Sequence, residues 1–98
     1  MIRHAALFRL HHAPGSPEET AFLDGLAALA AIPGVQEFRI ARALPRHNPY
    51  AFEVSMFFVD EATYDFYMTH PDHVAFAKAQ WIPGVAASLE NDTIQSNR

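Results

Sequence analysis

The segment from Phe52 to Val59 limits the possible folds more than any other part of the chain, because a strand here is apolar on both faces. Successive side chains of a strand point to opposite faces. One face would carry four large apolar side chains: Phe52, Val54, Met56 and Phe58. On the other face, Phe57 and Val59 would lie beside Ser55. Burying such a strand requires apolar cover on both sides of the sheet that contains it.

The first predicted helix has a defined beginning and end. Ser16 is followed by Pro17 at the first helical position and by Glu19 at the third, a combination typical of helix N-termini. Apolar residues then recur at helical spacing until Ile32, and the Pro-Gly pair at 33–34 ends the run. The pattern therefore predicts a helix over residues 17–32.

A second helical region is broken by a proline. Asp60 is a suitable cap for a short helix, which must end or kink at His70 because the residue before a proline is disfavoured in the α region. A further short helix is expected to begin at Pro71 and run towards Trp81. The Pro-Gly pair at 83–84 is expected to end it.

Three other segments show the alternation of a strand, namely Ile2–Leu10, Val35–Ala43 and, more weakly, the polar segment Val85–Ile94. Prolines and an asparagine in residues 44–50 predict a loop. The order strand, helix, two strands, broken helix, strand predicts an α+β, ferredoxin-like βαββαβ fold, with a four-stranded antiparallel sheet and helices on one face. We expect residues 1–98 to form one domain, whose last strand is a polar edge strand.

The sheet face away from the helices should be polar if it meets water. Instead, Phe57 and Val59 would lie there together with Ala5 and Leu7 of the first strand. An uncovered apolar face is a site for a partner. A two-fold homodimer that stacks sheet on sheet would bury this face. About 1,000 Å² of apolar contact at ~25 cal/mol per Å² would contribute a free energy that is large compared with the stability of so small a domain.

Composition excludes several classes of protein. Seven basic and eleven acidic residues give a net charge of −4 without charged runs, which argues against a nucleic acid partner. The chain has no cysteine, so disulfides, thiolate metal sites and cysteine nucleophiles are excluded. No apolar stretch approaches the ~20 residues that span a bilayer, and no secretion signal is present, so we expect no membrane insertion and a cytoplasmic location.

Two segments of the chain resemble one known family. Residues 1–10 (MIRHAALFRL) and 67–76 (YMTHPDHVAF) together are similar to the stress-responsive A/B barrel (Dabb) family, in element order over nearly the whole chain. The resemblance implies a dimeric α+β barrel with a cavity between sheet and helices. The family is similar to plant polyketide cyclases of the olivetolic acid type and, more distantly, to cofactor-free monooxygenases. Carried over by position, it implies that His73, Tyr67 and His4 are the catalytic residues. The polar last strand departs from the apolar ending of the family.

His73 is suited to act as a base on physical grounds. It falls in the first turn of the helix after Pro71, where the positive end of the helix dipole disfavours the imidazolium. A neutral His73 could take a proton from carbon beside a carbonyl, while Tyr67 donates a hydrogen bond to the developing enolate. Two alternatives stay open for these residues: a pocket that binds a ligand without catalysis, as in a stress-responsive binding protein, and a purely structural role at the kink. For the chain as a whole, a cofactor-free monooxygenase that oxidises an electron-rich aromatic is a third alternative.

His4 shares a strand face with Phe8, so it would point into the same cavity, where it orients substrate, bonds to Tyr67 or stays a core histidine. Four residues are of types that can bind a metal ion: His4, His70, Asp72 and His73. The intervening proline alters the helical spacing and no H-E-x-x-H pattern is present, so we predict no metal and no cofactor.

The expected ligand is a small, largely apolar, oxygenated molecule. Six apolar residues would line its cavity: Phe8, Phe22, Leu26, Phe58, Phe76 and Trp81. Apolar residues at such spacing more often simply fill a core, and this alternative also stays open. The pattern leaves undecided whether the loop over residues 44–50 gates the cavity.

Overall fold

The computed structural model describes residues 1–44 and 48–96. The elements are, in chain order, β1 (Ile2–Leu10), α1 (Pro17–Ala28), a 3₁₀ turn (Leu29–Ala31), β2 (Gln36–Arg42), β3 (Phe52–Phe58), α2 (Glu61–Thr69), α3 (Pro71–Phe76), a π-helical turn (Ala77–Trp81), α4 (Ile82–Gly84), β4 (Val85–Glu90) and β5 (Thr93–Ile94). Part of the predicted loop, residues 45–47, lies outside the described residues.

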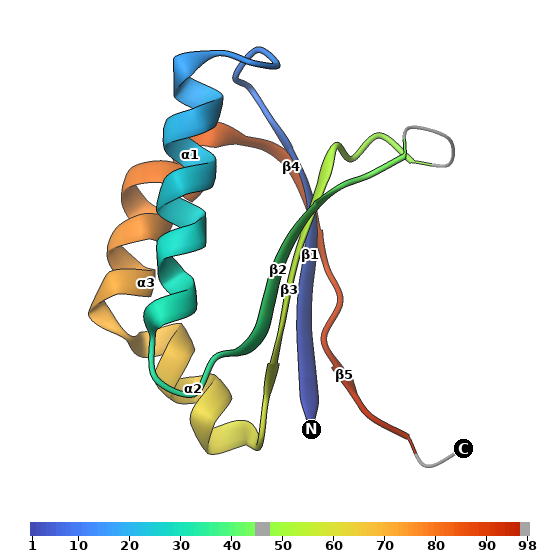
Figure 1. Cartoon of the computed structure of the whole chain (residues 1–98), viewed down its shortest axis with the longest axis vertical. Coiled ribbons are helices and arrows are strands. Elements are labelled where there is room, and N and C mark those ends of the chain that lie inside the picture. Colours follow the sequence, from blue (N-terminus) through green and yellow to red (C-terminus); the bar gives the residue numbers. More distant parts are fainter. Residues whose placement is uncertain (45–47, 97–98) are drawn as a thin grey trace.

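The sheet is antiparallel, with the strand order β2-β3-β1-β4, and β5 also pairs with β1. Figure 1 shows the sheet from its edge, with the helices on one side. This order and the helices on one side confirm the ferredoxin-like α+β prediction. The last strand is divided in two: Glu90 lies opposite Ala6, Ile94 lies opposite Ile2, and Asn91 and Asp92 fall between the two pieces. The division brings the Asp92 side chain beside β1, where the candidate site lies.

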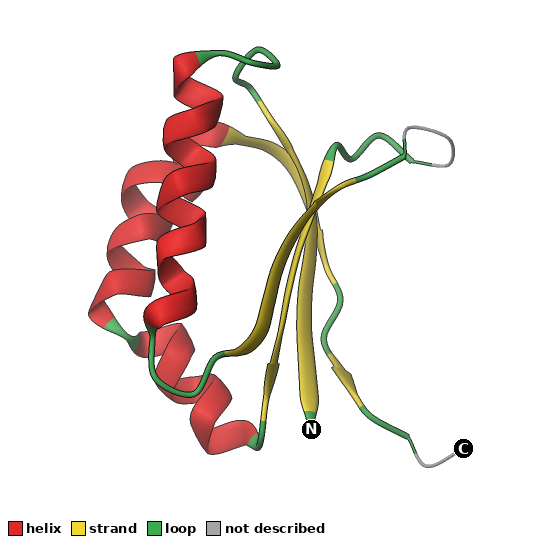
Figure 2. Ribbon diagram, viewed as in Figure 1, coloured by secondary structure: helices red, strands yellow, loops and turns green. Residues whose placement is uncertain are grey.

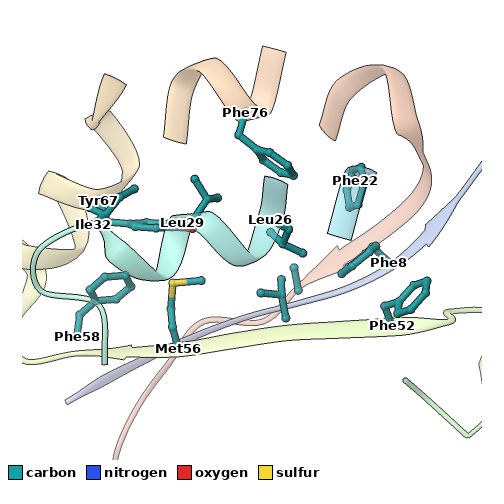
Figure 3. Packing of buried hydrophobic residues seen from close by; sticks show 12 residues of the cluster. Phe8, Phe22, Leu26, Leu29, Ile32, Phe52, Met56, Phe58, Tyr67 and Phe76 are labelled. Carbon is teal, nitrogen blue, oxygen red and sulfur yellow. The ribbon is translucent and has the colours of Figure 1, made fainter. Parts of the chain in front are cut away.

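The helices pack on one face of the sheet and the core fills the space between the two layers (Figure 2). Twelve buried residues make up this core: Ala6, Phe8, Phe22, Leu26, Leu29, Ile32, Phe52, Val54, Met56, Phe58, Tyr67 and Phe76. Figure 3 shows the aromatic members gathered from β1, β3, α1, α2 and α3. The alternating residues of β3 that face the helices, Phe52 to Phe58, are all at most 3% exposed, as their spacing predicts.

The predicted helix starts are formed by side-chain caps. The Ser16 hydroxyl accepts a hydrogen bond from the backbone N–H of Glu19 at 3.1 Å, and Asp60 accepts one from the N–H of Thr63 at 2.9 Å. His70 leaves the α region (φ −61°, ψ 137°), and its Nδ1 accepts a hydrogen bond from the N–H of Asp72. The kink at His70 is therefore confirmed, and it begins α3, which contributes Phe76 to the core.

A glycine brings the start of α2 close to the turn that follows α1. Gly34 has φ +94°, a backbone conformation that side chains rarely adopt. A Cβ added to Gly34 would overlap the Cγ2 of Thr63, in the first turn of α2. The absence of a side chain at this position therefore lets the helical layer close over the sheet.

The other face of the sheet carries both apolar and charged side chains. Leu7 and Leu89 lie opposite each other on β1 and β4, and Leu89 is 52% exposed. Arg3 and Glu53 on the same face form a salt bridge of 3.2 Å. In the described part of the chain no helix covers this face (Figure 2). The uncovered surface predicted from the sequence is therefore present. It is less apolar than predicted, because Arg3 and Glu53 lie on it beside Phe57.

None of the helices in the described ranges has the length and apolar character needed to cross a membrane.

Candidate functional site

A cavity of about 140 Å³ lies between the sheet and the helical layer. Nine of its lining residues are apolar or mainly apolar and come from β1, β3, α1, the 3₁₀ turn, α2, α3 and the π-helical turn: Ala6, Leu26, Leu29, Val54, Met56, Met68, Phe76, Ala77 and Trp81. Four others carry a titratable side chain: His4, Tyr67, His73 and Glu90. A largely apolar cavity with few polar groups is typical of small-molecule sites.

The geometry of His73 fixes which ring nitrogen can act as a base. Its Nδ1 lies 3.1 Å from the backbone oxygen of Met68. A carbonyl oxygen can only accept, so Nδ1 carries the hydrogen and Nε2 keeps a lone pair. Burial lowers the pKa of His73, and the nearby His4 lowers it further, while the bond to Met68 and the charge of Glu90 act in the opposite direction. The neutral ring is therefore favoured at neutral pH.

Tyr67 lies in the last turn of α2, and the centroids of its ring and that of His73 are 4.6 Å apart. The Tyr67 side chain is 2% exposed. Burial raises the pKa of its phenol, which therefore stays protonated and able to donate a hydrogen bond. No hydrogen bond of this hydroxyl involves another residue within 1–44 or 48–96, so the donor is free for a molecule in the cavity.

His4 is the third residue of β1, is 6% exposed and is held by a carboxylate. Its Nδ1 lies 2.5 Å from Oδ1 of Asp92, and the Tyr64 hydroxyl donates to Oδ2 of the same carboxylate at 2.5 Å. His4 is therefore bonded to Asp92, and not to Tyr67 as one sequence-based alternative supposed. The ring centroids of His4 and Tyr67 are 6.2 Å apart, so His4, Tyr67 and His73 gather at one end of the cavity.

Sequence reasoning missed Tyr64, Glu90 and Asp92. Tyr64 stands one helical turn before Tyr67, and this spacing was a usable indication that both face the sheet. Glu90 and Asp92 lie in the polar last segment, and the alternation of a continuous strand would have placed both on the helix side. Only the pairing with β1 shows which site they reach.

The structure separates the six predicted pocket residues into two groups. Leu26, Phe76 and Trp81 line the cavity. Phe8, Phe22 and Phe58 are 0% exposed and instead pack in the core beside it, because neighbouring aromatic rings enclose them: Phe8 against Phe22, Phe52 and Trp81, Phe22 against Phe76, and Phe58 against Tyr64 and Tyr67.

The four residues weighed as metal ligands do not converge. His70 uses its Nδ1 to cap α3, and His4 uses its Nδ1 to bind Asp92. Within the described ranges, no group of three or more His, Cys, Asp or Glu side chains could hold a metal ion.

The helix over the cavity contains a π-helical turn from Ala77 to Trp81. Such turns are rare, and they often occur at functional sites. Both ends of this one, Ala77 and Trp81, line the cavity. The irregular helix therefore helps to shape the cavity that His4 and His73 also line.

Comparison with known proteins gives one family. The model of the stress responsive A/B barrel domain (Dabb) matches residues 2–94. A Dabb family protein with a ferredoxin-like fold from Mesorhizobium loti is 43% identical, with a TM-score of 0.93 over 98% of this chain and 97% of that chain. Among curated proteins, no sequence matches this chain.

Two more distant structures share the fold. A dimeric ferredoxin-like protein of unknown function from Thermobifida fusca is 29% identical, with a TM-score of 0.78 over 96% of this chain and 90% of that chain. The hydroxynitrile lyase from Passiflora edulis is 16% identical, with a TM-score of 0.86 over 99% of this chain and 94% of that chain. At that identity the likeness concerns the fold alone.

Proposed function

Because the chain belongs to the stress responsive A/B barrel domain family, we propose that it binds a small, largely apolar carbonyl compound and removes a proton beside the carbonyl without a cofactor. The observation that carries the proposal is the pair formed by His73 and Tyr67. Over one cavity, a ring nitrogen with a free lone pair lies beside a phenol with a free proton. This pair provides what the abstraction of a proton from carbon requires.

The reaction would proceed in one proton transfer. Nε2 of His73 takes the proton from the carbon next to the carbonyl, and the electron pair of the C–H bond moves towards the carbonyl oxygen. The Tyr67 hydroxyl donates a hydrogen bond to that oxygen as its charge develops. Apolar walls such as Leu29 and Met56 exclude water, which strengthens both interactions. The product is an enolate that can form a bond to a second carbonyl, as a lyase or cyclase requires.

The size and charge of the cavity narrow the class of substrate. An apolar cavity of about 150 Å³ holds one molecule of benzene, so the cavity of about 140 Å³ fits a single ring or a short chain. Glu90 gives the described lining a carboxylate, and none of the described lining residues is Lys or Arg. We therefore infer that the substrate is neutral, because Glu90 would repel a carboxylate or phosphate.

The first test uses cyclohexanone, a neutral ketone with one ring, in deuterium oxide. We expect the protein to accelerate exchange of the protons next to the carbonyl, followed by proton NMR, and to lose about 10²-fold of this acceleration in Tyr67→Phe. Binding is followed independently by the fluorescence of Trp81, the one tryptophan of the chain. The matched control is Tyr50→Phe, because Tyr50 does not line the cavity.

The outcomes separate the candidate functions. Exchange that depends on Tyr67 and not on Tyr50 supports the enzyme. Fluorescence changes without any exchange contradict the enzyme and favour a ligand-binding protein. Exchange that is equal in Tyr67→Phe and in the unaltered protein contradicts the role given to Tyr67.

We further propose that two copies associate through the uncovered sheet face. Leu7 and Leu89 form an apolar pair there, and Phe57 lies on the same face of β3. The dimeric state of the Thermobifida fusca protein, of the same fold, supports this proposal. Charged residues such as Arg3 and Glu53 on this face would then set the relative orientation of the copies.

Leu89→Glu is expected to convert the dimer to a monomer at micromolar concentration. The substitution places a charge at a contact that excludes water, and such charges cost several kcal/mol unless they are paired. Phe66→Glu is the matched control: Phe66 is 49% exposed, close to the 52% of Leu89, but lies on α2 in the helical layer. Sedimentation velocity measures the mass. A control that dissociates equally, or a Leu89→Glu variant that stays dimeric, would contradict the sheet interface.

A further inference from the structure

The cavity presents two imidazole rings, and their partners differ. Each ring has its Nδ1 held by an oxygen: that of His73 by the backbone carbonyl of Met68, and that of His4 by the carboxylate of Asp92. In both rings the nitrogen left for a bound molecule is therefore Nε2. Since both histidines line the same cavity, one substrate could contact both of them.

The Asp92 carboxylate has two hydrogen-bond partners, Nδ1 of His4 and the Tyr64 hydroxyl. Burial acts to raise its pKa, but the hydrogen bonds from Tyr64 and His4 outweigh burial and the pKa is lowered. Asp92 therefore stays ionised while it accepts from Nδ1 of His4 and from the Tyr64 hydroxyl. A carboxylate on Nδ1 orients an imidazole and stabilises the imidazolium that forms when Nε2 takes up a proton. The backbone carbonyl of Met68, which carries no net charge, stabilises an imidazolium at His73 far less.

We propose that Asp92 and Tyr64 are positioning residues that act through His4, a catalytic residue implied by the family resemblance: they hold its Nδ1 so that its Nε2 can exchange a proton with a second oxygen of the substrate. This inference rests on the proposed function, in which the enolate forms a bond to a second carbonyl, and it concerns that step alone. Asp92 and Tyr64 do not line this cavity and act only through His4.

The proton count balances in both directions. In the bond-forming direction, Nε2 of His73 takes a proton from carbon, and the resulting enolate carbon attacks the carbon of the second carbonyl. The π electrons of that carbonyl move to its oxygen, which takes the proton from Nε2 of the His4 imidazolium. In the cleavage of a β-hydroxyketone, His73 first takes up a proton from water; neutral His4 then takes the hydroxyl proton, the carbon–carbon bond breaks, and the His73 imidazolium gives its proton to the enolate carbon. Exchange with water restores both rings.

The test compares two reactions in the same set of variants. Cleavage of diacetone alcohol to acetone, followed by proton NMR, needs both histidines, whereas proton exchange in cyclohexanone needs His73 and Tyr67 only. Asp92→Asn is expected to slow the cleavage about 10²-fold or more, and to leave both the exchange rate and the Trp81 fluorescence titration within a factor of about two. Asp92→Glu should restore part of the cleavage rate.

Asp65→Asn is the matched control. Asp65 is an exposed residue of α2 near the same end of the molecule, and it makes no contact with His4. The variant removes an equal charge, so a general electrostatic effect would appear in both variants. We expect cleavage by Asp65→Asn to match that of the unaltered protein.

The possible failures are distinguishable. If the protein exchanges cyclohexanone protons but does not cleave diacetone alcohol, or if Asp92→Asn slows both reactions equally, the role of His4 and Asp92 is overturned and the proposed function stands. If the protein catalyses neither reaction, both are overturned. Nitrogen NMR of the imidazoles gives a readout without substrate: a His4 ring that carries its hydrogen on Nε2 at neutral pH would also overturn the inference.

Discussion

His73→Gln is expected to slow proton exchange in cyclohexanone by about 10²- to 10⁴-fold, the range that a positioned general base contributes. Glutamine retains a hydrogen-bonding side chain of similar length, and so can still contact the backbone oxygen of Met68. It has no basic nitrogen, so the loss should fall on the proton transfer and not on binding. Proton NMR in deuterium oxide measures the exchange rate, and Trp81 fluorescence measures the affinity.

The pH dependence of the exchange rate tests the role of His73 independently. Burial lowers the pKa of His73, so the neutral base should persist at neutral pH and be lost only as the pH falls through a value below the ordinary 6.5. The exchange rate should therefore be level near neutral pH and decline in acid. His11→Gln, at an exposed position after β1, is the control and should keep both rate and profile. An unchanged profile in His73→Gln would remove His73 as the base.

The local parts of the fold could be predicted because each rests on nearby residues. Ser16, Asp60 and His70 all cap helices within three residues of themselves. The kink before Pro71 follows from the steric restriction that proline places on its neighbour. The alternation in β3 correctly assigned the buried face, because side-chain direction in a strand depends on position alone. The order of these elements along the chain then predicted the ferredoxin-like fold.

The candidate site was predictable in part. Tyr67 and His73 flank the same kink, so local geometry brings them together, and the alternation of β1 directs His4 to the same face. The partner of His4 was not predictable, because Asp92 is 88 residues away and reaches it only through the gap between β4 and β5. The polar character of that segment weakened the strand prediction, yet it provides the carboxylate in the site.

The boundary between cavity and core was also beyond the sequence pattern. Phe8 and Phe76 are both large, apolar and directed inward, but only Phe76 lines the cavity. What separates them is the packing of other rings around Phe8, and that depends on the complete arrangement of the helices over the sheet. Periodicity identifies which residues face inward, and does not identify where space is left between them.

Phe8→Ala is expected to lower the free energy of unfolding by about 3–5 kcal/mol, the usual cost of removing a buried phenylalanine. Phe8 is 0% exposed, and its ring centroid lies 5.2 Å from that of Trp81 and 5.3 Å from that of Phe52. A domain of this size has a total stability of roughly 5–15 kcal/mol, so the variant would lose a large part of it. Chemical denaturation, followed by far-ultraviolet circular dichroism, measures the change.

Phe66→Ala controls for the loss of a phenylalanine as such, because Phe66 is 49% exposed and its ring contacts that of His70 at 5.6 Å between centroids. Its cost should stay near about 0.5 kcal/mol. Phe8→Ala should also shift Trp81 fluorescence, since the indole loses its neighbour. If Phe8→Ala costs no more than Phe66→Ala and also lowers ligand affinity, the Phe8 ring belongs to the cavity wall and not to the core. The separation of core from cavity drawn between Phe8 and Trp81 would then be wrong.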